Sequence, residues 1–402
     1  MTLSIEHKAP NRAPNRAPNR VLLTLLVLML LADLCLPLLT DAPNRLISGT
    51  GITLFALLES HKQSQGAWLA LPFLLLAVLP FAPQTRPTQV MAAVSASLLL
   101  GGFSLLAGLT ANKLSGDADS LVRISFGGGF WISSGLCCLI AADAISRTAA
   151  RPSVRITANL LVFAPVAALL LCGQLDQLSI LKEYANRQDV FDDALLRHLQ
   201  ILILTLIPSV LLALPLGLAA FRRPRWRRSL FPLLNMIQTI PSIALFGLLI
   251  APLAAMARQL PWLAAQGVGG IGMAPAIIAL VLYSLLPLVR SIVAGLDQVP
   301  HAVVEAAIGM GLTRAQIFLR VEVPLALPVF LSGLRVTAVQ AVGLTVVAAL
   351  IGAGGLGSIV FQGLLSSALD LVLLGVIPVV VLAVLVDNMF KFIISSLATA
   401  HA

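Results

Sequence analysis

Four charged side chains lie in one short segment between two long apolar runs of the chain. The segment EAAIGMGLTRAQIFLRVEVP (305–324) carries Glu305, Arg314, Arg320 and Glu322. Charges of this kind are costly in hydrocarbon, so the segment is too polar to cross a membrane. Its apolar residues nevertheless recur at helical spacing, which indicates folded structure. A small, charged, folded segment between membrane spans is suited to contact another protein, and the alternative is an amphipathic connector lying on the lipid surface.

Local signals divide this segment into two short helices. Pro300 suits a first helical position, where no backbone donor is needed. Gly311 is suited to the left-handed conformation that ends a helix. Thr313 and Gln316 have the spacing of a capping box, which starts a second helix, and Pro324 is expected to close it.

Each of the two helices is expected to have an apolar face. These faces are formed by Val303, Ala307 and Met310 in the first helix and by Ile317, Phe318 and Val321 in the second. The sequence therefore predicts a helix–glycine turn–helix module with one side available to a partner.

The rest of the chain has the composition of a multi-span membrane protein. It has 402 residues, of which 58% are hydrophobic and only 11% are charged, whereas soluble domains are about 25% charged. Apolar runs long enough to cross about 30 Å of hydrocarbon as a helix are numerous. We expect an all-α integral membrane protein of about ten spans, at 21–40, 67–82, 89–111, 125–145, 156–175, 199–221, 230–256, 272–294, 325–350 and 371–392.

The positive charge is distributed as a membrane topology signal. With the N-terminus inside, 16 of the 26 Lys and Arg residues fall on inward segments and eight on outward ones, as the positive-inside rule predicts. The cluster RRPRWRR (222–228) is then a cytoplasmic anchor, with a lipid or partner contact as a secondary possibility. Both termini are expected in the cytoplasm and the charged module with them.

Changes in composition divide the chain into four parts. Residues 1–20 contain the repeat APNRAPNRAPNR and are expected to form a disordered basic tail. Residues 21–175 form a five-span extension, and 176–198 an outer amphipathic elbow, for which a solvated connecting loop is the alternative. Residues 199–396 form five spans rich in proline and glycine, with the charged module inside the loop 297–324. Broken helices of this kind are tolerated where they line a cavity or pack against partners.

Polar residues within the second group of spans are candidates for a transport path. Gln238, Thr239 and Ser242 flank Pro241, where they either repair the proline break by helix–helix hydrogen bonds or line the path. Arg335 lies near Gln340 in a kinked span, where it serves either a structural ion pair or a gate.

Other charged residues inside predicted spans are Asp33, Asp143 and Asp387. They form no cluster of acids at mid-membrane of the kind that a proton relay uses, and Asp143 and Asp387 fall close to inner span ends.

Motifs for ATP hydrolysis and for metal binding are absent from the sequence. It has no GxxxxGK[ST] phosphate-binding loop, so ATP and Mg²⁺ would be bound by another subunit. Two GxGxxG matches, beginning at Gly267 and Gly352, follow no strand of a βαβ unit and are read as turns. The cysteines show no CxxC spacing, the five histidines are scattered, and no aromatic cage is visible. We therefore expect no cofactor or metal on this chain and no enzymatic activity of its own.

The charged module carries a resemblance to a known family. Glu305-Ala306-Ala307, three residues, Gly311, nine residues and Val321-x-Val323-Pro324 resemble the EAA loop of ABC importer permeases, with valines in place of Ile and Leu. The resemblance implies a type I permease core in which this loop fits a cleft of an ATPase subunit. Carried over, the coupling positions are Glu305, Ala306, Ala307, Gly311 and Arg314.

The resemblance extends over about 178–390, where NMIQTIPSIALFGLLIAPL (235–253) and IGAGGLGSIVFQGL (351–364) look like permeases for glycine betaine and related osmoprotectants. The N-terminal extension looks most like the Yeh-type subgroup. The resemblance implies an inner-membrane permease that works by alternating access with an ATPase, a binding protein and a second permease copy. Alternatives from other classes are an ion-coupled secondary carrier for a small zwitterion and a membrane scaffold or integral membrane enzyme.

Overall fold

The computed structural model describes residues 18–44, 49–60, 67–115, 121–149, 151–265 and 267–400. The chain divides into two compact units, Met1–Lys182 and Glu183–Ala402, and each is described here by itself. Most of the predicted basic tail, 1–20, lies outside the described residues.

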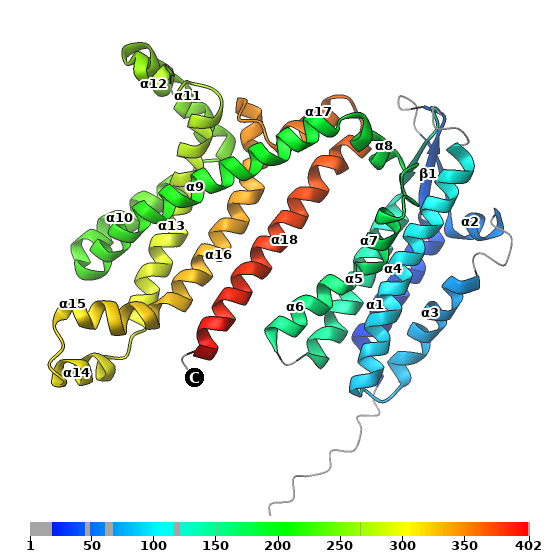
Figure 1. The fold of residues 1–402 in the computed structure, drawn as a ribbon, viewed down its shortest axis with the longest axis horizontal. Coiled ribbons are helices and arrows are strands. Elements are labelled where there is room, and N and C mark those ends of the chain that lie inside the picture. The colour runs from blue at the N-terminus through cyan, green and yellow to red at the C-terminus, as the bar shows by residue number, and fades with distance from the viewer. Residues whose placement is uncertain are drawn as a thin grey trace, which may run out of the picture. The chain divides into compact units, whose positions relative to one another are not determined.

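The first unit is a helical bundle that carries a small sheet at one end (Figure 1). Its helices are α1 (Arg20–Cys35), α2 (Leu54–Ser60), α3 (Ala67–Val78), α4 (Arg86–Ser115), α5 (Gly128–Thr148), α6 (Pro152–Leu161) and α7 (Ala164–Leu171), with a 3₁₀ turn at Leu79–Phe81. Strand β1 (Leu39–Ala42) pairs antiparallel with β2 (Thr50–Ile52) and with β3 (Arg123–Phe126), in the order β2-β1-β3. The core is apolar and includes Met29, Leu99, Phe103 and Ile140.

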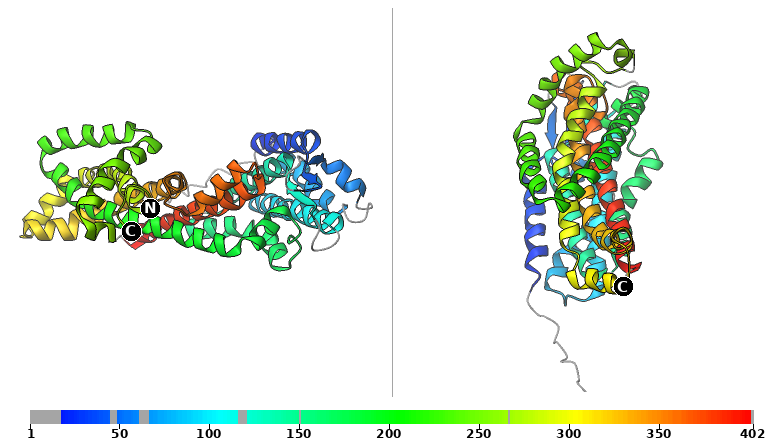
Figure 2. Two further views of the ribbon diagram at one scale, coloured as in Figure 1. Left: turned by 90° about the horizontal axis from the view of Figure 1, so that it is seen from above. Right: turned by 90° about the vertical axis from the view of Figure 1, so that its left-hand side faces the viewer.

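The second unit contains longer helices around a central one (Figures 1 and 2). Helix α8 (Ser179–Asn186) crosses the boundary between the units, and the unit continues with α9 (Gln188–Arg222), α10 (Pro224–Thr239), α11 (Ser242–Gln259), α12 (Pro261–Ala265), α13 (Met273–Asp297), α14 (His301–Gly309), α15 (Arg314–Ile317), α16 (Val323–Ala348), α17 (Leu356–Leu365) and α18 (Leu369–Ala400). The predicted outer elbow at 176–198 therefore consists of α8 and the first turns of α9.

Glycines allow the central helix α13 to approach its neighbour α16 closely. A Cβ on Gly295 would lie 2.8 Å from the backbone oxygen of Ala326, and one on Gly333 would lie 2.2 Å from Cβ of Ser291. Small residues at such a contact bring two helix backbones together, which is the usual way that membrane helices pack. This contact fixes the start of α16, and with it the end of the charged module.

The structure does not confirm the predicted count of ten spans. Among the described residues, seven helices are long and apolar enough to cross a membrane, or eight if one bent pair is counted as a span. The predicted span 21–40 is reduced to the 16 residues of α1, because Pro37 and the pairing of β1 turn the chain into a sheet. The predicted span 67–82 is reduced to the 12-residue helix α3 and a short 3₁₀ turn.

Two further predicted spans are broken helices. Residues 230–256 are divided between α10 and α11 at Ile240 and Pro241, since proline cannot donate the next helical hydrogen bond. Residues 156–175 form the bent pair α6 and α7, whose axes differ by 47°. A broken helix therefore occurs in the first unit as well as in the second.

Candidate coupling and translocation sites

The charged module folds as two helices around a left-handed glycine. Helix α14 begins after Pro300, which is its N-cap and not its first helical residue. Gly311 has a φ of +77°, and its N–H donates to the carbonyl oxygen of Ile308 at 2.9 Å. The predicted glycine turn is therefore confirmed, in a conformation that other residues adopt only with strain.

The predicted capping box starts the second helix. The backbone N–H of Gln316 donates to Oγ1 of Thr313 at 3.4 Å, and the N–H of Thr313 donates to Oε1 of Gln316 at 2.8 Å. Both donors are free at a helix start, so the reciprocal bonds fix where α15 begins.

The prediction that Pro324 closes this helix is wrong. The helix passes through a π-helical segment, Phe318–Glu322, and continues into α16, where Pro324 stands in the first turn. The N–H of Val323 bonds to the oxygen of Phe318, five residues back. This wider turn accommodates the missing donor and the bulk of the proline ring, so the module and the following span form one continuous helical rod.

The five predicted coupling residues lie together on this module, and most are exposed. Glu305, Ala306, Gly311 and Arg314 are exposed, whereas Ala307 is 1% exposed and packs inward. Within the described residues, neither Glu305 nor Arg314 forms an ion pair. The module therefore presents two charges that no neighbour among the described residues neutralises.

Of the three residues on the predicted apolar face of α14, Ala307 is buried whereas Val303 and Met310 are exposed. Val303 is 41% exposed and Met310 is 73% exposed, and Ile308 and Leu319 are similarly open. In the second helix, Ile317 is buried as predicted, with Phe318 and Val321 half-buried. Exposed large apolar residues beside unpaired charges are typical of a protein–protein contact surface.

Residues of the predicted topology anchor, 222–228, also contact this region within the same chain. The guanidinium of Arg222, at the end of α9, lies 5.3 Å from the ring centroid of Phe318. Arg227 of α10 pairs with Asp297 at the end of α13, with an N–O distance of 3.0 Å. The segment 222–228 thus contacts both ends of the loop 297–324, and the spacing of basic residues alone gave no sign of it.

The polar residues beside Pro241 close the break between α10 and α11. Nε2 of Gln238 donates to the carbonyl oxygen of Tyr283 at 2.6 Å, and the hydroxyl of Tyr283 donates to the carbonyl oxygen of Ile240. Thr239 donates to the oxygen of Met236 at 2.7 Å. Repair of the proline break, one of the two readings of Gln238, is therefore present, and Tyr283 is the partner that the sequence analysis did not identify.

Arg335 forms an ion pair between two long helices. Its Nε lies 2.5 Å from Oδ1 of Asp387 on α18, whose Oδ2 lies 2.6 Å from Nζ of Lys391. Gln340, five residues further along α16, is exposed. The path candidates therefore have different neighbours: Gln238 bonds to α13, whereas Arg335 faces α18.

The two GxGxxG matches meet at a turn. The N–H of Gly272 donates to the carbonyl oxygen of Ile351 at 2.8 Å, next to Gly352, whose φ is +79°. Both matches contain left-handed glycines in turns, and among the described residues no strand directly precedes either one.

This geometry defines a class of protein: a multi-span membrane chain with a proline-broken bundle and an exposed two-helix module on one polar loop. Comparison with known proteins identifies the family. Residues 209–398 match the family described as binding-protein-dependent transport system inner membrane component, and residues 18–181 match the N-terminal domain of the ABC transporter permease YehY.

Curated relatives match about half of the chain. The chain is 35% identical over 191 residues to the carnitine transport permease protein OpuCB of Listeria monocytogenes, covering 48% of this chain and 80% of the relative. It is 36% identical over 191 residues to the osmoprotectant import permease protein OsmW of Salmonella typhimurium, covering 48% and 84%. The chain therefore belongs to the binding-protein-dependent ABC importer permeases. Family membership does not favour the ion-coupled carrier.

A solved structure was also matched, that of the inward-facing MetNI methionine ABC transporter. The match has a TM-score of 0.46 and 23% identity and covers 53% of this chain and 98% of that chain.

Proposed function

We propose that this chain is the membrane-spanning subunit of an ATP-driven importer for glycine betaine or a related small osmoprotectant. The names of its relatives support this substrate class: one is a carnitine permease, one imports osmoprotectants, and a third, from Bacillus subtilis, is a choline permease 34% identical over 190 residues. Carnitine and choline carry a quaternary ammonium group, as glycine betaine does.

The observation that carries the coupling part of the proposal is the exposed module of α14 and α15. Its open side combines the apolar residues Ile308, Met310 and Leu319 with the unpaired charges of Glu305 and Arg314. In this proposal the cleft of a separate ATPase subunit buries the apolar residues and neutralises the charges. ATP and Mg²⁺ belong to that subunit, and this chain catalyses no reaction.

The continuous rod of α15 and α16 offers a direct mechanical link. Because the π-helical segment joins the module to the span without a loop, displacement of the docked module tilts α16. Arg335 lies on this helix and ties it to α18. In the proposed alternating-access cycle, two copies of the chain face one another, and closure of the ATPase moves their α16 helices together.

The substrate is delivered by a binding protein on the outer side. One relative, from Helicobacter pylori, is named as both a permease and an ergothioneine binding protein, which supports such a partnership. The path candidates near the helix break are Gln238, Thr239, Pro241 and Ser242. The other two candidates, Arg335 and Gln340, lie on α16. Thr239 and Gln340 are exposed in the single chain. In the proposed assembly they either contact the second copy or line the transport path.

We place both termini in the cytoplasm on the positive-inside distribution. In this orientation 21–175 is a membrane extension, 176–198 an outer elbow and 199–396 the transport core.

Reconstitution tests the function. The permease, with its ATPase, is placed in proteoliposomes that face radiolabelled glycine betaine and the purified binding protein. We expect uptake that requires ATP and the binding protein and that persists when proton and sodium gradients are collapsed. Uptake that follows an ion gradient and ignores ATP would establish the secondary carrier instead.

A further inference from the structure

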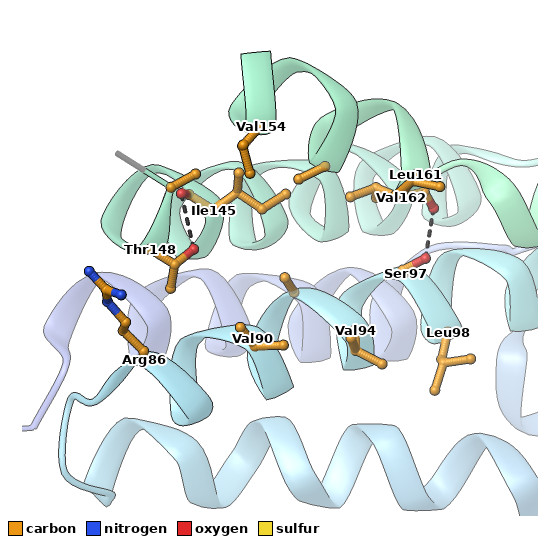
Figure 3. A pocket seen from close by; sticks show the side chains of 13 residues that line it. Arg86, Val90, Val94, Ser97, Leu98, Ile145, Thr148, Val154, Leu161 and Val162 are labelled. Atoms are coloured by element: carbon orange, nitrogen blue, oxygen red, sulfur yellow. Dashed lines mark hydrogen bonds between the residues drawn. The ribbon is translucent and has the colours of Figure 1, made fainter. Parts of the chain in front are cut away.

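The first unit contains an apolar groove that plays no part in the proposed transport cycle. It lies between α4, α5 and α6 and has a volume of about 540 Å³, within the range of about 300–1,000 Å³ typical of small-molecule sites. Figure 3 shows Val90, Val94 and Leu98 of α4 on one wall and Val154 and Leu161 on the other. Beside this groove, the axes of α6 and α7 differ by 47°.

The hydroxyl groups of the groove are already used by the protein. Oγ of Ser97 donates to the carbonyl oxygen of Val162 at 2.8 Å, and Oγ1 of Thr148 donates to the oxygens of Ala144 and Ile145, each at 3.2 Å (Figure 3). The walls therefore offer a ligand almost nothing but hydrocarbon. A zwitterionic solute would lose its hydration there without gaining partners, whereas an alkyl chain would lose nothing.

One end of the groove is strongly positive. Arg86 stands at this end in Figure 3, where α4 begins, α5 ends at Thr148 and α6 begins at Pro152. These boundaries bring Arg147, Arg151 and Arg155 to the same end of the unit.

Only one of these four arginines has a carboxylate partner within the described residues. Arg147 is held by Asp143, with N–O distances of 2.8 and 3.0 Å. Arg86, Arg151 and Arg155 are exposed and form no ion pair in the described part of the chain. The N-terminus of α6 adds further positive potential, since its N-cap Arg151 supplies no side-chain acceptor.

We propose that this groove binds an anionic phospholipid of the inner leaflet, with one acyl chain along the α4–α6 walls and the phosphate beside Arg86 and Arg151. The apolar walls select a chain over any soluble ligand. The arginines select a negative headgroup over a zwitterionic one, and they lie on the side that the charge distribution places at the cytoplasmic surface, where anionic lipids attract basic residues. The site makes the first unit a lipid-binding module.

Native mass spectrometry of the purified full-length permease tests this site. The protein is equilibrated in nanodiscs containing equal amounts of phosphatidylglycerol and phosphatidylcholine, and the lipid retained after release is counted. We expect the wild type to retain one phosphatidylglycerol per chain in preference to phosphatidylcholine. Arg86→Gln with Arg151→Gln should reduce that preference by about fivefold per arginine removed, whereas Arg258→Gln in the second unit should leave it unchanged.

A second pair of variants tests the groove itself. Ala158→Phe places a ring in the groove and should abolish retention, whereas Ala168→Phe, on the exposed side of α7, should not. Equal retention of the two lipids by the wild type, or an unchanged preference in the double arginine variant, would overturn the proposal. Loss of both lipids in the arginine variant with a normal melting temperature would also contradict it, because the apolar walls would then contribute no binding.

Discussion

The two units each contain a broken helix, and each break is closed by one hydroxyl group from a neighbouring helix. In the first unit, Ser97 of α4 donates to Val162 at the bend between α6 and α7. In the second, Tyr283 of α13 donates to Ile240 at the break before Pro241. A carbonyl freed by a helix break in hydrocarbon costs several kcal/mol if it stays unpaired, so both units solve the same problem in the same way.

The difference lies in what surrounds each break. The break in the second unit is held by a second hydrogen bond, from Gln238 to Tyr283. It belongs to the unit whose α16 continues into the exposed module. The bend in the first unit borders a groove whose hydroxyl groups are hydrogen-bonded, and the described residues of that unit form no exposed two-helix module like that of α14 and α15. Similar helix breaks therefore occur in a unit that we propose moves during transport and in a unit that we propose binds lipid.

The largest effect is expected when proline replaces Gly311, a left-handed glycine of the second unit, and the comparison is the same change at Gly173, a left-handed glycine of the first unit. Gly311→Pro forces a φ near −65° where the backbone has +77° and removes the donor to Ile308. ATP-driven uptake should fall to background and the ATPase should no longer co-purify, while membrane insertion stays normal. Glu305→Lys should have the same effect through charge reversal at the same surface.

Gly173→Pro is the matched change in the first unit, at a φ of +69°. It should lower the melting temperature and leave uptake within about twofold of wild type, since its cost lies in local backbone strain. Normal uptake and normal ATPase binding in Gly311→Pro would remove the assigned role of the module.

The second prediction compares a half-buried acid–arginine pair in the second unit with a more exposed pair in the first. Asp387→Asn leaves Arg335 and Lys391 without their shared carboxylate between α16 and α18. An unpaired charge at the centre of a membrane helix costs about 2.5–3.5 kcal/mol, and less where the side chain reaches water. We expect uptake to fall at least tenfold, with a smaller loss in Arg335→Gln because Lys391 still pairs with Asp387.

Asp143→Asn is the corresponding change in the first unit. Its partner Arg147 is four residues away on the same helix and its side chain is 43% exposed, so the pair should contribute only about 0.3–0.5 kcal/mol. Thermal unfolding and uptake should both remain near wild type. A tenfold loss of uptake in this variant would show that the first unit also transmits the transport motion.

Local spacing made the turn and the cap of the module predictable. The capping box of Thr313 and Gln316 and the left-handed turn of Gly311 each depend on a few consecutive residues, so the sequence contains the whole signal. The prediction at Pro324 is wrong. A proline normally ends a helix, but here a π-helical turn allows the helix to continue past it.

Longer-range features could not be read in this way. The strands of the first unit pair Thr40 with Gly51 and with Ser125. No local sequence pattern predicts a strand partner as distant as Ser125. Helical spacing predicted that Val303 and Met310 share an apolar face, but periodicity cannot show whether such a face packs against the same chain or against another. The ion pair of Arg227 and Asp297 was not predicted, because a pair 70 residues apart in sequence depends on the tertiary fold.

The third prediction tests the two hydroxyl groups directly. Tyr283→Phe leaves the oxygen of Ile240 without this donor, and Ser97→Ala does the same to Val162. Each change should destabilise the protein by about 1–3 kcal/mol, measured as a shift in thermal unfolding. In Tyr283→Phe, uptake should also fall several-fold, because the break beside Pro241 loses the bond that sets its angle. An unshifted melting temperature in Ser97→Ala would show that the two breaks are not held in the same way.

The smallest effect is expected at the helix caps. Thr313→Ala removes the acceptor for the Gln316 N–H at the start of α15, and Asn19→Ala removes the acceptor for the Leu22 N–H at the start of α1. Loss of either cap should cost about 1 kcal/mol of helix stability. Because Thr313 is exposed and α15 lies within the docking surface, its loss should raise the ATPase concentration needed for half-maximal uptake a few-fold without changing the maximal rate.

Asn19 is buried and also donates to Gln84 at 3.1 Å, so its loss should lower the melting temperature more than the loss of Thr313 does and leave the ATPase titration unchanged. Identical ATPase titrations for both variants would mean that the start of α15 does not form part of the contact.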